Sequence, residues 1–157
     1  MNTKPDRAAE VYLNGFNCAQ AVFSTYAEQF GMDKTSALKI SCGFGAGMGR
    51  QQEMCGAISG AIMLIGCKYG KTIREDNAAN DLTYKLVREV SERFRTKHGS
   101  TLCKELLEGC NLLTPEGQKF YKENDFQHRK CAVYVHDAAE WVEPLLVNAG
   151  SDEKERK

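Results

Sequence analysis

The sequence lacks several features that assign a chain to a common functional class. Its 21 Lys and Arg residues balance 21 Asp and Glu residues over a length of 157, so the formal net charge is zero. A chain without excess positive charge is not expected to bind nucleic acid or an anionic membrane surface through its overall field. Its uncharged, apolar stretch at residues 54–67 is 14 residues long and too short to span a bilayer. We therefore expect no nucleic-acid partner and no membrane insertion.

Motifs for nucleotide chemistry, hydrolysis and secretion are also missing. Residues 1–15 contain no apolar core of a signal peptide, and the chain shows no P-loop and no Ser/His/Asp set. Neither CxxC nor CxxCH occurs, which argues against knuckle-type zinc sites and covalent c-type haem. The chain does have seven cysteines, an odd number that fits poorly with a static disulfide framework. We expect a cytoplasmic protein whose cysteines are ligands, redox centres or small core residues.

Apolar residues recur at three- and four-residue spacing along most of the chain, which predicts helices. No segment shows the alternation of a half-buried strand. We predict an all-α fold, with one domain over residues 1–150 that forms a bundle of about six to seven helices, followed by a charged, disordered tail at 151–157. The predicted helical segments are 8–12, 18–26, 33–42, 53–69, 76–99, 103–109, a short helix from 115, and 129–146.

Several polar residues stand where a predicted helix begins. Asn17, Asp33 and Ser100 have side chains that can accept a hydrogen bond from the first free N–H groups, so we expect each to cap a helix. Thr114-Pro115 is expected to start another short helix, with the proline in its first position. Pro144 lies in the last turn of the final segment and is expected to kink or end it.

Glycine occurs at every second position of GFGAGMG, residues 43–49. The spacing is not GxGxxG and no strand precedes it, so a nucleotide site is disfavoured. Glycines permit positive φ angles and close backbone approach, and successive N–H groups then form a concave site for an anion such as a thiolate or cluster sulfur. A tight helix crossing explains the glycines equally well. The candidate cofactor-binding glycines are Gly45, Gly47, Gly49 and Gly56.

Cys55 opens the next predicted helix, where the helix dipole and free N–H groups are expected to lower the pKa of its thiol. Arg50, a few residues upstream, would add to this effect. Gly56 and Gly60 lie one turn apart and form a smooth groove, although each glycine costs a helix about 1 kcal/mol relative to alanine. We interpret the groove as a site of close helix approach, and a homodimer is one candidate for its use.

The stretch CGAISG, residues 55–60, carries a resemblance to a known family. It resembles the CGAxxG element of the small redox-associated proteins named for their C_GCAxxG_C_C signature. The other cysteine elements of that signature resemble NCAQAV at 17–22, LCKELL at 102–107 and KCAVYV at 130–135, in the right order. The resemblance implies an all-helical redox protein whose four signature cysteines are Cys18, Cys55, Cys103 and Cys131.

The resemblance leaves two kinds of redox chemistry open for these four cysteines. Four thiolates suit an iron–sulfur cluster, and a related domain in split-Soret cytochromes has been linked to such a cluster. Two thiols would suffice for thiol/disulfide cycling, which needs no cofactor. We favour the cluster slightly, consider zinc less favoured, and expect a redox partner protein.

Three further cysteines lie outside the signature. Cys42, beside the glycine segment, is a candidate additional ligand, whereas Cys67 and Cys110 are expected to be small buried core residues. The competing interpretation of the whole chain is a non-catalytic helical interaction module that partners an oxidoreductase and is stabilised by zinc.

Overall fold

The computed structural model describes residues 2–147, and over that range the chain is helical, which confirms the predicted all-α fold. Within these residues there are seven α-helices of nine or more residues and no β-strand; Met54 and Leu102 form an isolated bridge. The long helices are α1 (Lys4–Leu13), α2 (Cys18–Tyr26), α3 (Lys34–Cys42), α5 (Gly56–Tyr69), α6 (Asn77–His98), α8 (Pro115–Glu123) and α9 (Ala132–Val147). Shorter elements are α4 (Gly45–Met48), α7 (Cys103–Leu106), a 3-10 turn (Ala27–Phe30) and a π-helical turn (Gln127–Cys131). The predicted tail at 151–157 lies outside the described residues.

Two of the three predicted caps, Asn17 and Asp33, are confirmed, and so is the helix start at Thr114-Pro115. Asn17, Asp33 and Thr114 each accept a hydrogen bond from a backbone N–H in the first turn of the helix that follows. The prediction for Ser100 is wrong, because Leu102 occupies the N-cap position of α7 and no side chain caps the helix. The Ser100 hydroxyl instead accepts a bond of 3.0 Å from the Leu102 N–H and holds the turn before the helix.

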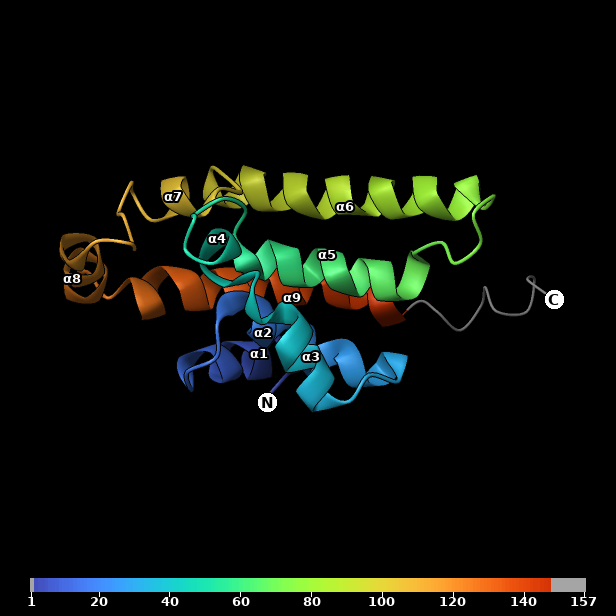
Figure 1. The fold of residues 1–157 in the computed structure, drawn as a ribbon, viewed down its shortest axis with the longest axis horizontal. Coiled ribbons are helices and arrows are strands. Elements are labelled where there is room, and N and C mark those ends of the chain that lie inside the picture. The colour runs from blue at the N-terminus through green and yellow to red at the C-terminus, as the bar shows by residue number, and fades with distance from the viewer. Residues whose placement is uncertain (1, 148–157) are drawn as a thin grey trace.

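Helix α5 lies at the centre of the bundle and packs against α2, α6 and α9 (Figure 1). It starts at Gly56 rather than at the predicted residue 53, and its first six residues are all buried. A Cβ at Gly60 would lie 2.9 Å from the Val22 Cβ and 3.0 Å from the Ala19 carbonyl oxygen. The predicted groove is therefore filled by α2 of the same chain, and it gives no support to a homodimer.

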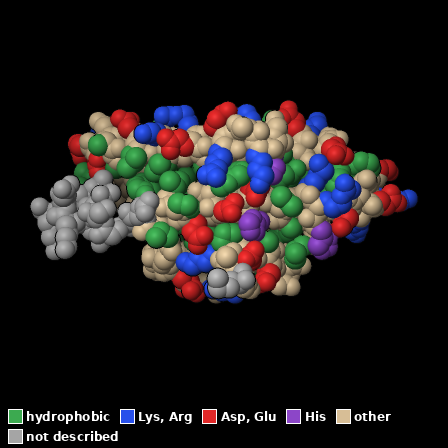
Figure 2. All heavy atoms as spheres, turned by 180° about the vertical axis from the view of Figure 1, so that it is seen from behind, with side chains coloured by type: hydrophobic (Ala, Val, Ile, Leu, Met, Phe, Trp, Pro, Cys, Tyr) green, Lys and Arg blue, Asp and Glu red, His purple; other side chains and the backbone are tan. Residues whose placement is uncertain are grey.

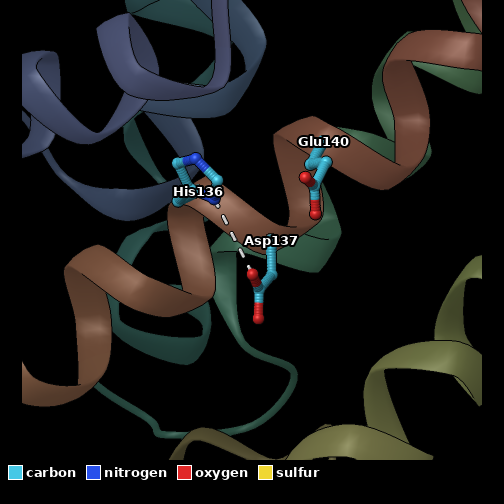
Figure 3. A group of neighbouring side chains, drawn as sticks. All are labelled: His136, Asp137 and Glu140. Atoms are coloured by element: carbon cyan, nitrogen blue, oxygen red, sulfur yellow. Dashed lines mark ion pairs between the residues drawn. The ribbon is translucent and has the colours of Figure 1, made fainter.

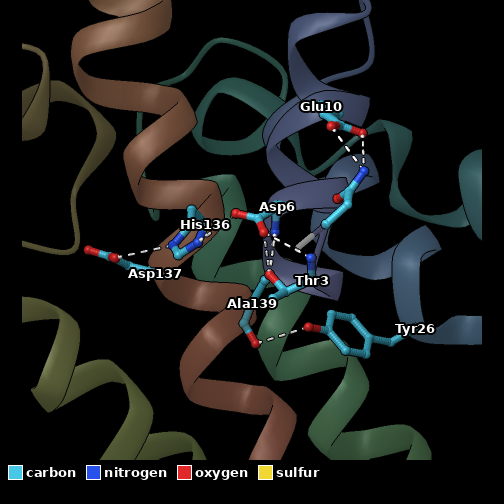
Figure 4. A network of polar contacts seen from close by, with 8 residues as sticks. Thr3, Asp6, Glu10, Tyr26, His136, Asp137 and Ala139 are labelled. Carbon is cyan, nitrogen blue, oxygen red and sulfur yellow. Dashed lines mark hydrogen bonds and ion pairs between the residues drawn. The ribbon is translucent and has the colours of Figure 1, made fainter.

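The N-terminal helix α1 is attached to α9 by polar contacts (Figure 4). Thr3 caps α1 through a reciprocal bond with Asp6, and the Asp6 carboxylate lies 3.4 Å from His136 Nε2 on α9. On the same side of the bundle the Tyr26 hydroxyl donates to the Ala139 carbonyl at 3.3 Å. These contacts hold α1 and α2 against α9. The residues at the ends of the three helices are therefore held in fixed positions relative to one another.

The short elements α4 and α7 and the helix α8 gather at one end of the bundle, next to the starts of α5 and α9 (Figure 1). A small second core of Cys103, Leu107, Cys110 and Phe126 lies there, separate from the main core along α2, α5 and α9. The first residues of α5 and the second core therefore face each other at this end. This is where the site lies.

Helix α9 continues through Pro144 to Val147, so the proline comes three residues before the helix ends. On the face that Figure 2 shows, acidic and basic side chains are interspersed, in keeping with the zero net charge. None of the described helices combines the length and apolar character needed to cross a membrane.

Candidate functional site

The glycine segment forms a left-handed turn. Residues 46–50 all have positive φ, with values of 52°, 66° and 68° at the non-glycine residues Ala46, Met48 and Arg50. L-residues avoid this region because the Cβ approaches the carbonyl, and alternating glycines lower that cost at every second residue. Both Gly47 and Gly49 have φ of 64°. The alternation in the sequence thus encodes a tight reversal of the chain rather than a phosphate cradle.

The turn returns the chain to a short antiparallel pairing that brings two cysteines together. The Cys55 N–H donates to the Thr101 carbonyl at 2.8 Å, and the Cys103 N–H donates to the Glu53 carbonyl at 2.7 Å. A third bond joins the Lys104 N–H to the Gln52 carbonyl at 3.1 Å. Because these bonds join 52–55 to 101–104, the starts of α5 and α7 lie side by side.

All four signature cysteines line one cavity of about 350 Å³. Cys18 is the first residue of α2, Cys55 caps α5, and Cys103 is the first residue of α7. Cys131 ends the π-helical turn before α9, a type of distortion that is frequent at functional sites. Four thiols from four helix ends therefore meet at a single cavity, as the family signature predicts.

Burial raises the pKa of the thiols of Cys55 and Cys103, the two buried residues among the signature cysteines. It raises the pKa of Cys55 well above its ordinary value, and charges on Cys18, Cys131 and Cys103 would raise it further. Burial likewise raises the pKa of Cys103 to about 12, followed by the effects of Cys18 and Cys131. The prediction of a low-pKa thiol at Cys55 is therefore wrong for the metal-free chain, because desolvation exceeds the effect of the helix N-terminus.

Burial also raises the pKa of Cys18 and Cys131, but specific donors oppose it at both. The backbone N–H of Ala46, in the left-handed turn, is the first of these donors for Cys18. For Cys131 the opposing donors are the hydroxyls of Tyr121 and Tyr12. The site thus places hydrogen-bond donors around sulfur atoms that would be negatively charged as ligands.

The cavity contains cationic side chains but no carboxylate among its lining residues in the described chain. Arg50 and Lys122 line it, and both are exposed. The aromatic residues Tyr12, Tyr121 and Tyr134 form part of its wall. This surrounding favours a centre that carries net negative charge.

The glycines predicted to bind a cofactor have different positions. Gly56 lines the cavity, and a Cβ there would overlap the Cys18 Sγ. Gly45 and Gly47 are buried but do not line the cavity, and a Cβ on Gly45 would overlap the Asn17 side chain. Gly49 is exposed and serves the turn through its positive φ.

The cysteines outside the signature do not line the cavity. Cys42 is exposed on the surface at the end of α3. Cys110 is buried, as predicted, and its thiol donates to the Gly117 carbonyl at 3.0 Å. The prediction that Cys67 is buried is wrong: it is exposed together with Gly66, because the neighbouring helices leave this face of α5 uncovered near its end.

Gln52 is a residue of the site that the sequence analysis missed. It is 6% exposed with φ of 59°, and its side chain joins the turn to the loop before α8. Its amide donates to the Cys110 carbonyl at 2.7 Å and accepts from the Leu112 N–H at 2.9 Å. The only available signal was its place next to the glycine segment, and partners about 60 residues away leave no local pattern.

A second group of potential ligands, His136, Asp137 and Glu140, lies on α9 (Figure 3). Their ligand atoms lie within 4.8 Å of one another. However, the buried Asp137 carboxylate already lies 2.7 Å from Lys97 Nζ and 2.7 Å from His98 Nε2. We interpret this group as a structural link between α6 and α9, since the lysine supplies the positive charge that a metal would bring.

The helical fold and the four-cysteine cavity define a class of cysteine-centred, all-α proteins. The profile of the family described as "Putative redox-active protein (C_GCAxxG_C_C)" matches residues 16–145, and the chain belongs to this family. Neither the curated proteins nor the solved structures contain a match.

Proposed function

We propose that the protein transfers electrons through an iron–sulfur cluster ligated by Cys18, Cys55, Cys103 and Cys131. The observation that carries this proposal is the convergence of four thiols from four helix ends on one cavity. Thiol/disulfide exchange needs one attacking and one resolving cysteine, whereas an iron–sulfur cluster takes four thiolates. The number of cysteines at the cavity therefore favours a cluster.

The electrostatics of the thiols support a metal-centred site. Burial raises the pKa of all four, so the metal-free thiols stay protonated near neutral pH. The thiolate is the form that attacks a disulfide, which makes these thiols poor nucleophiles. A bound cation reverses this situation, because a coordinating thiol is deprotonated outright.

The spacing of the sulfur atoms favours a cluster over a single zinc ion. Among the described residues, the group whose ligand atoms all lie within 4.8 Å of one another is the one on α9, and it contains no cysteine. A tetrahedral zinc site with Zn–S bonds of 2.3 Å needs sulfur atoms about 3.8 Å apart. The cysteine sulfur atoms are therefore too far apart to bind one ion together, and they line a cavity that can hold a group of several metal ions, such as an iron–sulfur cluster.

A bound cluster would accept and return single electrons without a change in covalent bonding of the protein. Cys18, Cys55, Cys103 and Cys131 would hold the cluster; Cys55 and Cys103 are buried residues, whereas Cys18 and Cys131 are partly exposed. We place electron exchange with a redox partner protein at the side of the cavity where these two residues are partly exposed. A cytoplasmic location is part of the proposal, since a reducing compartment keeps the thiols free.

The test is anaerobic reconstitution of the purified chain with ferrous iron and sulfide, followed by an absorption spectrum and assays of iron and acid-labile sulfide. We expect charge-transfer bands in the visible, and their loss in Cys55→Ser. Cys67→Ser is the matched control, because Cys67 is an exposed cysteine of the same helix α5, and it should retain the bands.

A colourless chain with no iron would overturn the cluster proposal. Zinc uptake without redox activity would support the alternative of a non-catalytic interaction module. A disulfide that forms reversibly between two of the cavity cysteines would establish thiol/disulfide cycling instead.

A further inference from the structure

Two tyrosines far apart in the sequence meet at the wall of the cavity. Tyr12 belongs to α1 and Tyr121 to α8, and their hydroxyl oxygens lie 2.7 Å apart. Both residues line the cavity together with Cys131. The proposed electron transfer gives neither tyrosine a role.

One of the two hydroxyl protons of this pair is free to form a hydrogen bond with a third group. Each hydroxyl carries one donor proton, and the bond between the two oxygens uses only one of them. The described chain has no buried side-chain oxygen or nitrogen without a hydrogen-bond partner. Cys131 lines the same cavity as both tyrosines and packs with Tyr121 against the same small core, so its sulfur is the acceptor that we assign to the second proton.

We propose that Tyr12 and Tyr121 form a hydrogen-bonded pair that donates an O–H to the Cys131 sulfur and thereby raises the reduction potential of the cluster; this inference rests on the proposed function. Reduction adds one electron to the cluster and makes its sulfur ligands more negative. A donor to a ligand sulfur stabilises the reduced form more than the oxidised form, and hydrogen bonds to sulfur are among the features that set cluster potentials. The tyrosine protons stay on their oxygens throughout.

The pair is suited to remain a donor. A tyrosine hydroxyl has an ordinary pKa of about 10, so both hydroxyls keep their protons at neutral pH. Because Tyr12 comes from the first helix and Tyr121 from α8, the pair also closes the cavity between two elements that are distant in the sequence.

The experiment compares reduction potentials of the reconstituted wild type, Tyr12→Phe and Tyr121→Phe by anaerobic titration with dithionite. We expect each variant to disfavour the reduced form by about tenfold, which lowers the potential of a one-electron couple by about 59 mV. The double variant should lie close to the single ones, since either change disrupts the pair. Tyr69→Phe is the control: its hydroxyl bonds the Leu145 carbonyl at 2.6 Å, away from the cavity, and its potential should equal that of the wild type.

A second measurement reports the hydrogen bond itself. Transfer of the wild type to D₂O should shift the Fe–S stretching bands in the resonance Raman spectrum, and the shift should shrink in both cavity variants. Equal potentials and equal isotope shifts in wild type and variants would overturn the inference while the cluster stands. A variant that assembles no cluster would overturn it too, since the tyrosines would then act in assembly. A wild type that binds no iron would overturn the proposed function and, with it, this inference.

Discussion

The Cys18 sulfur occupies the space that a side chain at position 56 would need. A Cβ on Gly56 would also lie 3.0 Å from the Phe44 carbonyl oxygen and 3.1 Å from the Ala19 nitrogen, both backbone atoms. The glycine of the family signature thus has a steric reason: the start of α5 passes directly against a ligand on α2. The contact positions Cys18 and Cys55 at the same cavity.

Gly56→Ala should therefore displace Cys18 or the start of α5. We expect a loss of about 2 kcal/mol in the free energy of unfolding, because the overlap is with backbone and a ligand sulfur. Iron uptake should fall with it. Urea unfolding and iron per chain measure the two effects.

Gly66→Ala is the matched control for this change. Gly66 is exposed in the same helix, and a Cβ there would have no neighbour within 4 Å. It should gain up to about 1 kcal/mol through helix propensity and keep full iron uptake. Equal stability of the two variants would contradict the steric role of Gly56.

Two glycines of the left-handed turn have the same φ angle but different surroundings, so alanine substitutions at these positions can be compared directly. Gly47 and Gly49 both have φ of 64°, but a Cβ on Gly47 would lie 2.6 Å from the Gln52 Cα, whereas one on Gly49 would have open space. Gly49→Ala should lose about 1–2 kcal/mol from conformational strain alone. Gly47→Ala should lose clearly more, since it adds overlap with backbone.

Thermal and urea unfolding of these two variants separate strain from packing. Similar losses of unfolding free energy in both variants would show that the backbone of residues 52 and 53 can move aside to accept a Cβ at position 47. The turn would then not be held in place by its contact with these residues. A larger loss in Gly47→Ala alone would confirm that the turn is held against the strand-like segment before Cys55.

Gln52 is expected to be the main polar support of the cavity wall. Gln52→Ala leaves the Cys110 carbonyl and the Leu112 N–H without their partner, and unsatisfied buried groups cost about 1–3 kcal/mol each. We expect a loss of at least about 2 kcal/mol and weaker retention of iron. Stability is measured by urea unfolding and retention by the rate of cluster loss to a chelator.

Two variants make the Gln52 test specific. Gln51→Ala removes an exposed neighbour and should change stability by less than about 0.5 kcal/mol. Gln52→Glu keeps an oxygen for Leu112 but removes the donor to Cys110, so it should also be destabilised. A stable Gln52→Ala variant with normal iron retention would show that the wall is held by the backbone pairing alone.

The parts of the fold that depend on local chemistry could be predicted from the sequence. Asn17, Asp33 and Thr114 lie beside the N–H groups that they cap, so the signal and its effect are within three residues. The four cavity cysteines were identified from a signature rather than from spacing, since their separations of 28 or more residues carry no geometric information.

The parts that depend on long-range packing could not be predicted. The Tyr12–Tyr121 contact joins residues 109 positions apart, and two tyrosines on separate amphipathic helices are equally consistent with core packing. Cys67 lies in a helix that is apolar all round for most of its length, so no polar face of the predicted helix marked it as exposed. The pKa of Cys55 depends on how deeply the other helices bury it, which the position at a helix start does not reveal.

The raised thiol pKa values predict how the metal-free protein responds to alkaline pH. Burial raises the pKa of Cys103 to about 12 from an ordinary value of 9.0. Between these two values the folded chain keeps the proton and the unfolded chain loses it. The folded state is therefore favoured in full below pH 9, and that contribution is lost as pH rises through 12.

Urea unfolding of the metal-free chain at pH 8, 9 and 10 measures this loss. We expect the free energy of unfolding to fall by about 1 kcal/mol between pH 9 and pH 10 for Cys103 alone, with further contributions from the other cavity thiols. Cys103→Ser should show a shallower fall, whereas Cys42→Ser, which removes an exposed thiol outside the cavity, should match the wild type. Identical slopes in wild type and Cys103→Ser would mean that the thiol gains no protection from the fold. The cavity would then be open to water, and the case for thiols that need a metal to ionise would fail.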